Sequence, residues 1–100
     1  MIRGTTPLHT FRLTFDAEFI SKVRILYAQN DTVVLAKETE DCNLEGSTIK
    51  VKLTQEDTLA FDSNYPVEIQ VRVLLTDGNA LASKLKKVTA ERCLDNEVLK

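Results

Sequence analysis

The stretch that decides the fold is residues 48–76, TIKVKLTQEDTLAFDSNYPVEIQVRVLLT. It begins with apolar and polar residues in strict alternation over residues 48–53 and ends with a longer alternation over residues 66–76. A period of two is typical of a strand with one buried face. The stretch therefore predicts two strands, and the length of the second indicates a central place in its sheet.

Between these two alternations, the segment TQEDTLAF predicts a short helical turn near residues 55–60. Thr54 and Asp57 have the spacing of a capping box, in which each side chain bonds to the other's backbone. A helix this short needs packing beneath it, so we expect Leu59 and Phe61 to enter the core. The string LTQEDT is similar to the corner between strands E and F of immunoglobulin-like domains, although Phe61 lacks the hydroxyl of the usual corner tyrosine.

The same alternation continues on both sides of this stretch. Asn30-Asp31 and Asp77-Gly78 are residue pairs that favour tight hairpin turns. The polar segment 38–47 is assigned to a loop, and the lysines near the end of the last run suit a sheet edge. Further strands are predicted over residues 8–15, 22–27, 32–39 and 80–90.

These strands predict an all-β fold, an antiparallel β-sandwich of the immunoglobulin-like kind with about six to seven strands. The 100 residues suit one compact core, and a hydrophobic fraction of 43% is sufficient for folding. We expect a single domain over residues 1–100, with extended tails at residues 1–7 and 91–100.

The charge distribution bears on the kind of partner. Residues 1–50 contain six Lys/Arg and seven Asp/Glu, and residues 51–100 contain seven and eight, so neither half is a basic arm. This balance makes nucleic acid an unlikely partner, since phosphate backbones need clustered positive charge. Five basic residues could form a basic stripe if the strands that carry them are neighbours. We favour instead an ordinary charged sheet face that is paired with Glu68. The five residues are Arg12, Arg24, Lys50, Lys52 and Arg72.

No apolar run approaches the ~20 residues that cross a bilayer. The first residues, MIRGTTPLHTF, lack the uninterrupted apolar centre of a secretory signal. We therefore expect a protein made and kept in solution, without a membrane partner.

Residues that could perform catalysis are few. His9 is the only histidine, and a lone histidine at the start of a strand is more often structural than a catalytic base. Cys42 and Cys93 lie too far apart for a CxxC pair and are expected to be free thiols. The acidic segment 38–45 does not have the spacing of a calcium loop. We expect no catalytic residue, cofactor, metal or small-molecule substrate.

The two tails are the candidate sites for binding another protein. Tails of small domains are most often frayed ends. Alternatively, the tails dock on a neighbouring subunit and supply an extended strand or a helical apolar face. The candidate interaction residues are Ile2, Leu94, Val98 and Leu99.

The segments MIRGTTPLHTF, VRILYAQN and VEIQVRVLLTDGNALASK resemble small proteins encoded by phages and prophages of gram-positive bacteria. The resemblance implies a virion component of the tail, baseplate or capsid, made in the bacterial cytoplasm and assembled in many copies with other virion proteins. It transfers no functional residue to this chain. We therefore expect a non-catalytic structural or adaptor protein that forms a homo-oligomer, ahead of a carbohydrate- or nucleic-acid-binding module and of a small enzyme.

Overall fold

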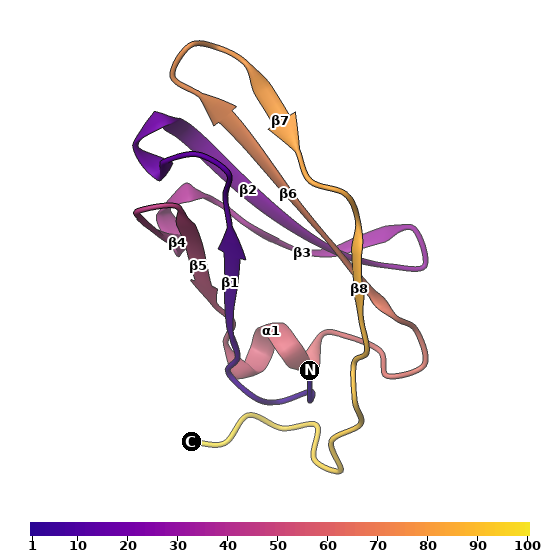
Figure 1. Ribbon diagram of the computed structural model, residues 1–100. Helices are drawn as coiled ribbons and strands as arrows, with labels where there is room; N and C mark the ends of the chain where they lie inside the picture. The colour runs from indigo at the N-terminus through magenta and orange to yellow at the C-terminus, as the bar shows by residue number, and fades with distance from the viewer.

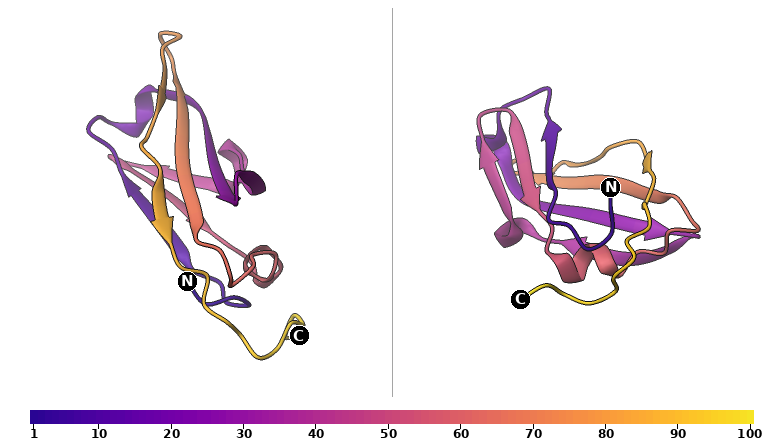
Figure 2. Two further views of the ribbon diagram at one scale, coloured as in Figure 1. Left: turned by 90° about the vertical axis from the view of Figure 1, so that its right-hand side faces the viewer. Right: turned by 90° about the horizontal axis from the view of Figure 1, so that it is seen from below.

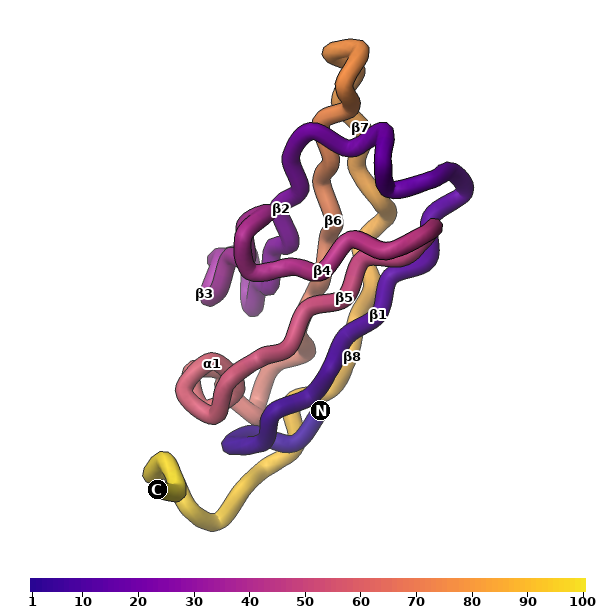
Figure 3. Tube along the Cα trace, turned by 90° about the vertical axis from the view of Figure 1, so that its left-hand side faces the viewer, coloured from indigo at the N-terminus to yellow at the C-terminus, as the bar shows by residue number.

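The computed structural model describes residues 1–100 as two antiparallel sheets packed face to face (Figure 1). The smaller sheet has the order β1 (Leu8–Arg12), β5 (Thr48–Lys52) and β4 (Cys42–Glu45). Figure 3 shows these three strands side by side in front of the larger sheet. The larger sheet has the order β3 (Thr32–Lys37), β2 (Ile20–Gln29), β6 (Val67–Leu75) and β7 (Ala80–Ala82), and β8 (Lys86–Val88) also pairs with β6.

This strand order is that of an immunoglobulin-like sandwich. The smaller sheet β1–β5–β4 corresponds to strands B, E and D, and the larger sheet corresponds to strands C′, C, F and G. The predicted all-β antiparallel sandwich is confirmed. One strand of the constant-type arrangement is missing, because no strand occupies the place of strand A beside β1.

The core lies between the inner faces of the two sheets. Alternate residues of β2 and β6 are buried, as the period of two predicts. Tyr27 and Ile25 of the larger sheet and Ile49 of the smaller one are completely buried. Each such side chain contributes about 1.5–3 kcal/mol relative to an exposed position.

The connection between β5 and β6 contains the predicted helical turn, α1 (Gln55–Leu59). The Thr54 hydroxyl accepts the Asp57 N–H at 3.1 Å, and the Asp57 carboxylate accepts the Thr54 N–H at 2.8 Å. This is the expected capping box. Phe61 is 1% exposed and so fills the core at this corner, as expected. Leu59 is only half-buried and lies outside the core cluster, so its predicted core position is wrong.

Both predicted turns are present. Asn30 and Asp31 have positive φ angles of 50° and 64°, the conformation of a two-residue hairpin turn that matches the twist of the flanking strands. Gly78 has a φ of 91°, and its N–H donates to the Leu75 carbonyl at 3.0 Å.

The structure has eight strands rather than six to seven, and several boundaries differ from the prediction. β2 extends two residues beyond the predicted 22–27 at each end, and β3 ends at Lys37 instead of residue 39. The segment 38–47, assigned to a loop, contains the 3-10 turn Thr39–Asp41 and the edge strand β4. The first strand ends at Arg12 instead of residue 15. The run over residues 80–90 is split into β7 and β8, because the Ser83 hydroxyl accepts the Val71 N–H and interrupts regular pairing.

Candidate functional site

The two ends of the chain meet at the α1 end of the sandwich (Figures 1 and 2). The N–H of Arg3 donates to the Glu91 carbonyl at 3.0 Å, and the N–H of Glu91 donates to the Met1 carbonyl at 2.7 Å. Ile2 thereby forms a parallel β-bridge with Glu91. The tails are thus held against the domain rather than frayed from it.

Side chains also hold the C-terminal segment. The Arg3 guanidinium donates to the Asn96 side chain at 3.1 Å and to the Leu59 carbonyl at 2.9 Å. The Gln55 amide accepts the Leu99 N–H at 2.7 Å and donates to the Leu99 carbonyl at 3.1 Å. The segment therefore rests on α1 through a small number of polar contacts.

The structure places the four candidate interaction residues at this end of the molecule, which we call the terminal surface. Ile2 is 47% exposed, Leu94 92% and Leu99 75%. Val98 is half-buried and lines a shallow hollow with residues of α1 and the end of β5. Three large apolar side chains are thus open to solvent, on segments whose backbone is anchored at Arg3, Glu91 and Leu99.

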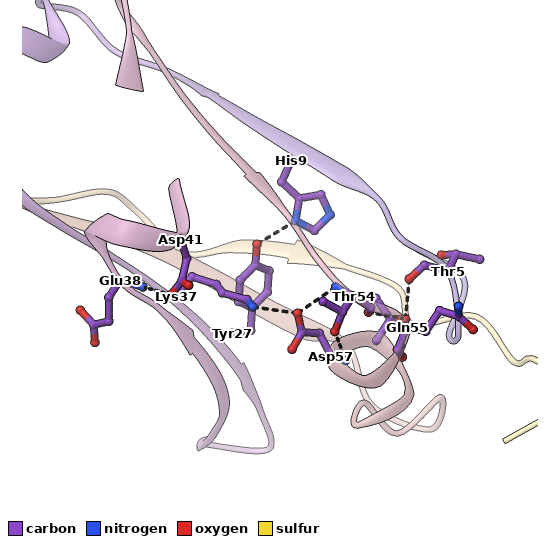
Figure 4. A network of polar contacts seen from close by, with 10 residues as sticks. Thr5, His9, Tyr27, Lys37, Glu38, Asp41, Thr54, Gln55 and Asp57 are labelled. Carbon is purple, nitrogen blue, oxygen red and sulfur yellow. Dashed lines mark hydrogen bonds and ion pairs between the residues drawn. The ribbon is translucent and has the colours of Figure 1, made fainter. Parts of the chain in front are cut away.

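Figure 4 shows a network of polar contacts around α1 and the neighbouring strands, which includes the only histidine. His9 Nδ1 lies 2.8 Å from the hydroxyl of Tyr27, so the pair links β1 to β2 across the sandwich. Burial, followed by the positive charges of the N-terminus and Lys86, lowers the pKa of His9. Burial raises the pKa of Tyr27, with smaller contributions from Cys42 and Asp57. Both groups are therefore neutral at pH 7, as suits a structural hydrogen bond.

A second contact in Figure 4 joins α1 to β3 of the larger sheet. Lys37 Nζ on β3 lies 2.8 Å from the Asp57 carboxylate, and both side chains are 15% exposed. Burial acts to raise the pKa of Asp57, but the hydrogen bonds from Lys37 and Thr54 and the Lys37 charge outweigh it, so the pKa is lowered. Asp57 therefore remains ionised while it caps α1.

The other groups considered for chemistry are spread over the molecule. Cys42 and Cys93 are unpaired and half-buried. Burial and the nearby charge of Asp41 raise the pKa of Cys42, which disfavours its reactive thiolate. No group of three or more His, Cys, Asp or Glu side chains is placed to hold a metal ion.

The five basic residues considered as a stripe do not share one face. Arg24 and Arg72 are directly opposite each other on the outer side of the larger sheet. Lys50 pairs with Thr10 in the smaller sheet, which also carries the other two basic residues. Arg24 is paired with Glu38 at 2.8 Å, and Glu68 lies opposite Lys87. The basic residues are therefore split between the two sheets and partly neutralised.

The sequence did not reveal one further feature, an open sheet edge at β1. The Leu53 N–H donates to the Pro7 carbonyl and the Leu13 N–H donates to the Ser47 carbonyl, at 3.0 and 2.7 Å. Bonded residues alternate along an antiparallel pair, so the backbone groups of residues 8, 10 and 12 point away from β5. No other segment bonds to them. Sequence alone shows a strand here but not which edges are paired.

No protein-family model, curated protein or solved structure matches this chain. None of its helices has the length and apolar character needed to span a membrane.

Proposed function

We propose that this chain is a non-catalytic structural or adaptor protein of a phage particle that assembles through protein–protein contacts. The observation that carries the proposal is the terminal surface, where Leu94 and Leu99 are 92% and 75% exposed. Burying a leucine side chain is worth about 1.5–3 kcal/mol. Two such side chains on one short segment offer a partner apolar surface to bury.

The way the tails are held favours binding to a protein. The backbone of Arg3, Glu91 and Leu99 is tied to the domain by hydrogen bonds, so the exposed side chains are presented without the full cost of ordering a loose tail. The division of the basic residues between the two sheets argues against a continuous nucleic-acid surface. The assignment to a phage particle is supported by the resemblance of the sequence to small phage and prophage proteins.

The proposal is tested by asking whether the chain is incorporated into particles. An epitope-tagged chain is produced in cells that release the corresponding phage, and particles are purified by density gradient and analysed by mass spectrometry. The variant Leu94→Asp/Leu99→Asp is compared with Val33→Asp, a control at a 54% exposed position on β3.

We expect the unmodified chain and the Val33→Asp control in the particles at several copies each. The double variant is expected to fold normally, since neither leucine is buried, and to be depleted at least about tenfold. Absence of the unmodified chain from particles would overturn the proposal. Normal incorporation of the double variant would show that the terminal surface does not mediate incorporation.

A further inference from the structure

We propose that the open edge of β1 accepts the C-terminal segment, residues 91–100, of a second copy of this chain as an added strand. This inference rests on the proposed function, because it names the partner and the contact through which assembly occurs. Its starting point is that an immunoglobulin-like sandwich of the constant type has a strand beside B, and here that place is empty.

The edge is available for pairing along its whole length. Three residues of β1 direct six backbone groups away from β5, and no segment of the chain bonds to them. The side chains of these residues, Leu8, Thr10 and Arg12, are exposed, with Leu8 at 59%. Unpaired strand edges of this kind are ready templates for an extended segment.

The chain's own first residues do not fill the place. Ile2 bridges Glu91, beyond the end of β8, and the chain turns at Gly4 before β1 begins. The N-terminal segment therefore lies against the end of the larger sheet and leaves the β1 edge uncovered.

Charge selects the kind of segment that fits. Three strands near the empty place, β1, its neighbour β5 and β8 of the larger sheet, carry five positive charges and no negative one (Figure 3). Only Lys87 among them faces an acidic residue on a neighbouring strand, Glu68. The edge therefore favours an extended segment with acidic residues. The five charges are those of Arg12, Lys50, Lys52, Lys86 and Lys87.

The C-terminal segment has this chemistry. Between Cys93 and Leu99 its only charged residues are Asp95 and Glu97, which alternate with Leu94 and Val98 in the period of a strand. One side of an added strand would thus be acidic, toward the lysines of β5, and the other mainly apolar, toward the space between the sheets.

The segment can leave its position and reach a neighbour. Ala90, 1% exposed, is the last residue of the core. Beyond it the segment is held by the two backbone hydrogen bonds of Glu91 and by the side-chain contacts of Asn96 and Leu99, all of which must break for it to leave. Ten extended residues span about 33 Å, so five can pair along β1 while the others cross between copies. Moving the segment onto a neighbouring copy replaces these contacts by the backbone hydrogen bonds of a strand added to β1.

The test uses the full-length chain over a concentration series. Sedimentation equilibrium gives the association constant, and amide hydrogen exchange followed by NMR gives protection at Leu8, Thr10 and Arg12. We expect self-association, with exchange of these amides slowed at least about tenfold at concentrations where the chain is associated.

Two variants separate this contact from others. Thr10→Pro removes the outward N–H without touching a β1–β5 hydrogen bond, and its matched control Thr10→Ala keeps that N–H. We expect loss of association only in the proline variant. Leu94→Asp, at a 92% exposed position, leaves folding intact and is expected to weaken association at least about tenfold, which tests the contact even if Thr10→Pro does not fold.

The outcomes distinguish this inference from the proposed function. Association that persists in Thr10→Pro, with rapidly exchanging β1 amides, overturns the edge contact and leaves assembly by another surface standing. A chain that stays monomeric at millimolar concentration overturns pairing with a second copy, while its incorporation into particles, measured separately, decides the proposed function.

Discussion

Replacing Asp57 by alanine is expected to destabilise the domain more than any other substitution of a surface carboxylate. Asp57 caps the first turn of α1 through the Thr54 N–H, and the same carboxylate lies 2.8 Å from Lys37 on β3. It therefore fastens the connection between β5 and β6 to β3 of the larger sheet. Both partners of the ion pair are only 15% exposed, so solvent weakens the contact less than at an open surface.

The size of the effect follows from the two contacts. Loss of a capping interaction costs about 1 kcal/mol. Loss of a hydrogen bond between charged, partly buried groups costs about 1.5–3 kcal/mol. Together they amount to about 2.5–4 kcal/mol, a large part of the ~5–15 kcal/mol stability of a typical domain. The melting temperature should fall by roughly 10–25 °C.

Urea denaturation followed by circular dichroism measures the free energy of unfolding of Asp57→Ala. A double-mutant cycle of Lys37→Met with Asp57→Asn isolates the ion pair. The matched control is the Arg24–Glu38 pair, whose side chains are 53% and 40% exposed and whose coupling should stay below about 1 kcal/mol. A cost below about 1 kcal/mol for Asp57→Ala, or equal couplings in the two cycles, would refute this account of the corner.

Three further outcomes are expected from single substitutions. Because the pKa of His9 is lowered in the folded state, the unfolded chain takes up a proton more readily than the folded one. The free energy of unfolding should therefore fall as the pH drops below about 6.5. His9→Gln should flatten this pH dependence in urea titrations at pH 5 and 7. Asp31→Gly should stabilise the β2–β3 hairpin by a few tenths to about 1 kcal/mol in thermal unfolding, because φ is 64° at this position; an unchanged or lower melting temperature would speak against the turn. Phe61→Ala should cost about 3–5 kcal/mol in urea denaturation, and a loss under 1 kcal/mol would mean that the ring does not fill the core.

The long alternations identified the strands that form the centre of the fold. β5 and β6 were predicted almost to their ends, because each has one buried face and a neighbour on both sides. The capping box at Thr54 and Asp57 was also predicted, since its two residues are close in sequence. Local signals of this kind survive folding because tertiary contacts reinforce them.

Edge strands were harder to predict. β4 has only four residues, of which Cys42 and Leu44 are half-buried, so its alternation is lost in an acidic segment. The division between β7 and β8 depends on a hydrogen bond from the Val71 backbone to the Ser83 hydroxyl, 12 residues away. Neither composition nor period contains that information.

The sequence identified the residues of the candidate site but not their arrangement in space. The apolar residues at the two ends were identified, but their gathering beside α1 depends on contacts such as Arg3 with Asn96, 93 residues apart. The open edge of β1 was not identified, because an unpaired edge is a property of the sheet order. The Lys37–Asp57 and His9–Tyr27 contacts are likewise between strands and turns distant in sequence.

The claim that the C-terminal segment of one copy pairs with β1 of another is tested most directly by a filtered nuclear Overhauser experiment on a mixed sample. One population is labelled with nitrogen-15 and the other with carbon-13 at its leucine and valine methyl groups, and they are mixed at a concentration where the chain is associated. We expect transfer from the methyl groups of Leu94 and Val98 in one copy to the amide protons of Thr10 and Arg12 in the other. Associated chains that show no such transfer would contradict the claim that the tail of one copy completes the sandwich of the next.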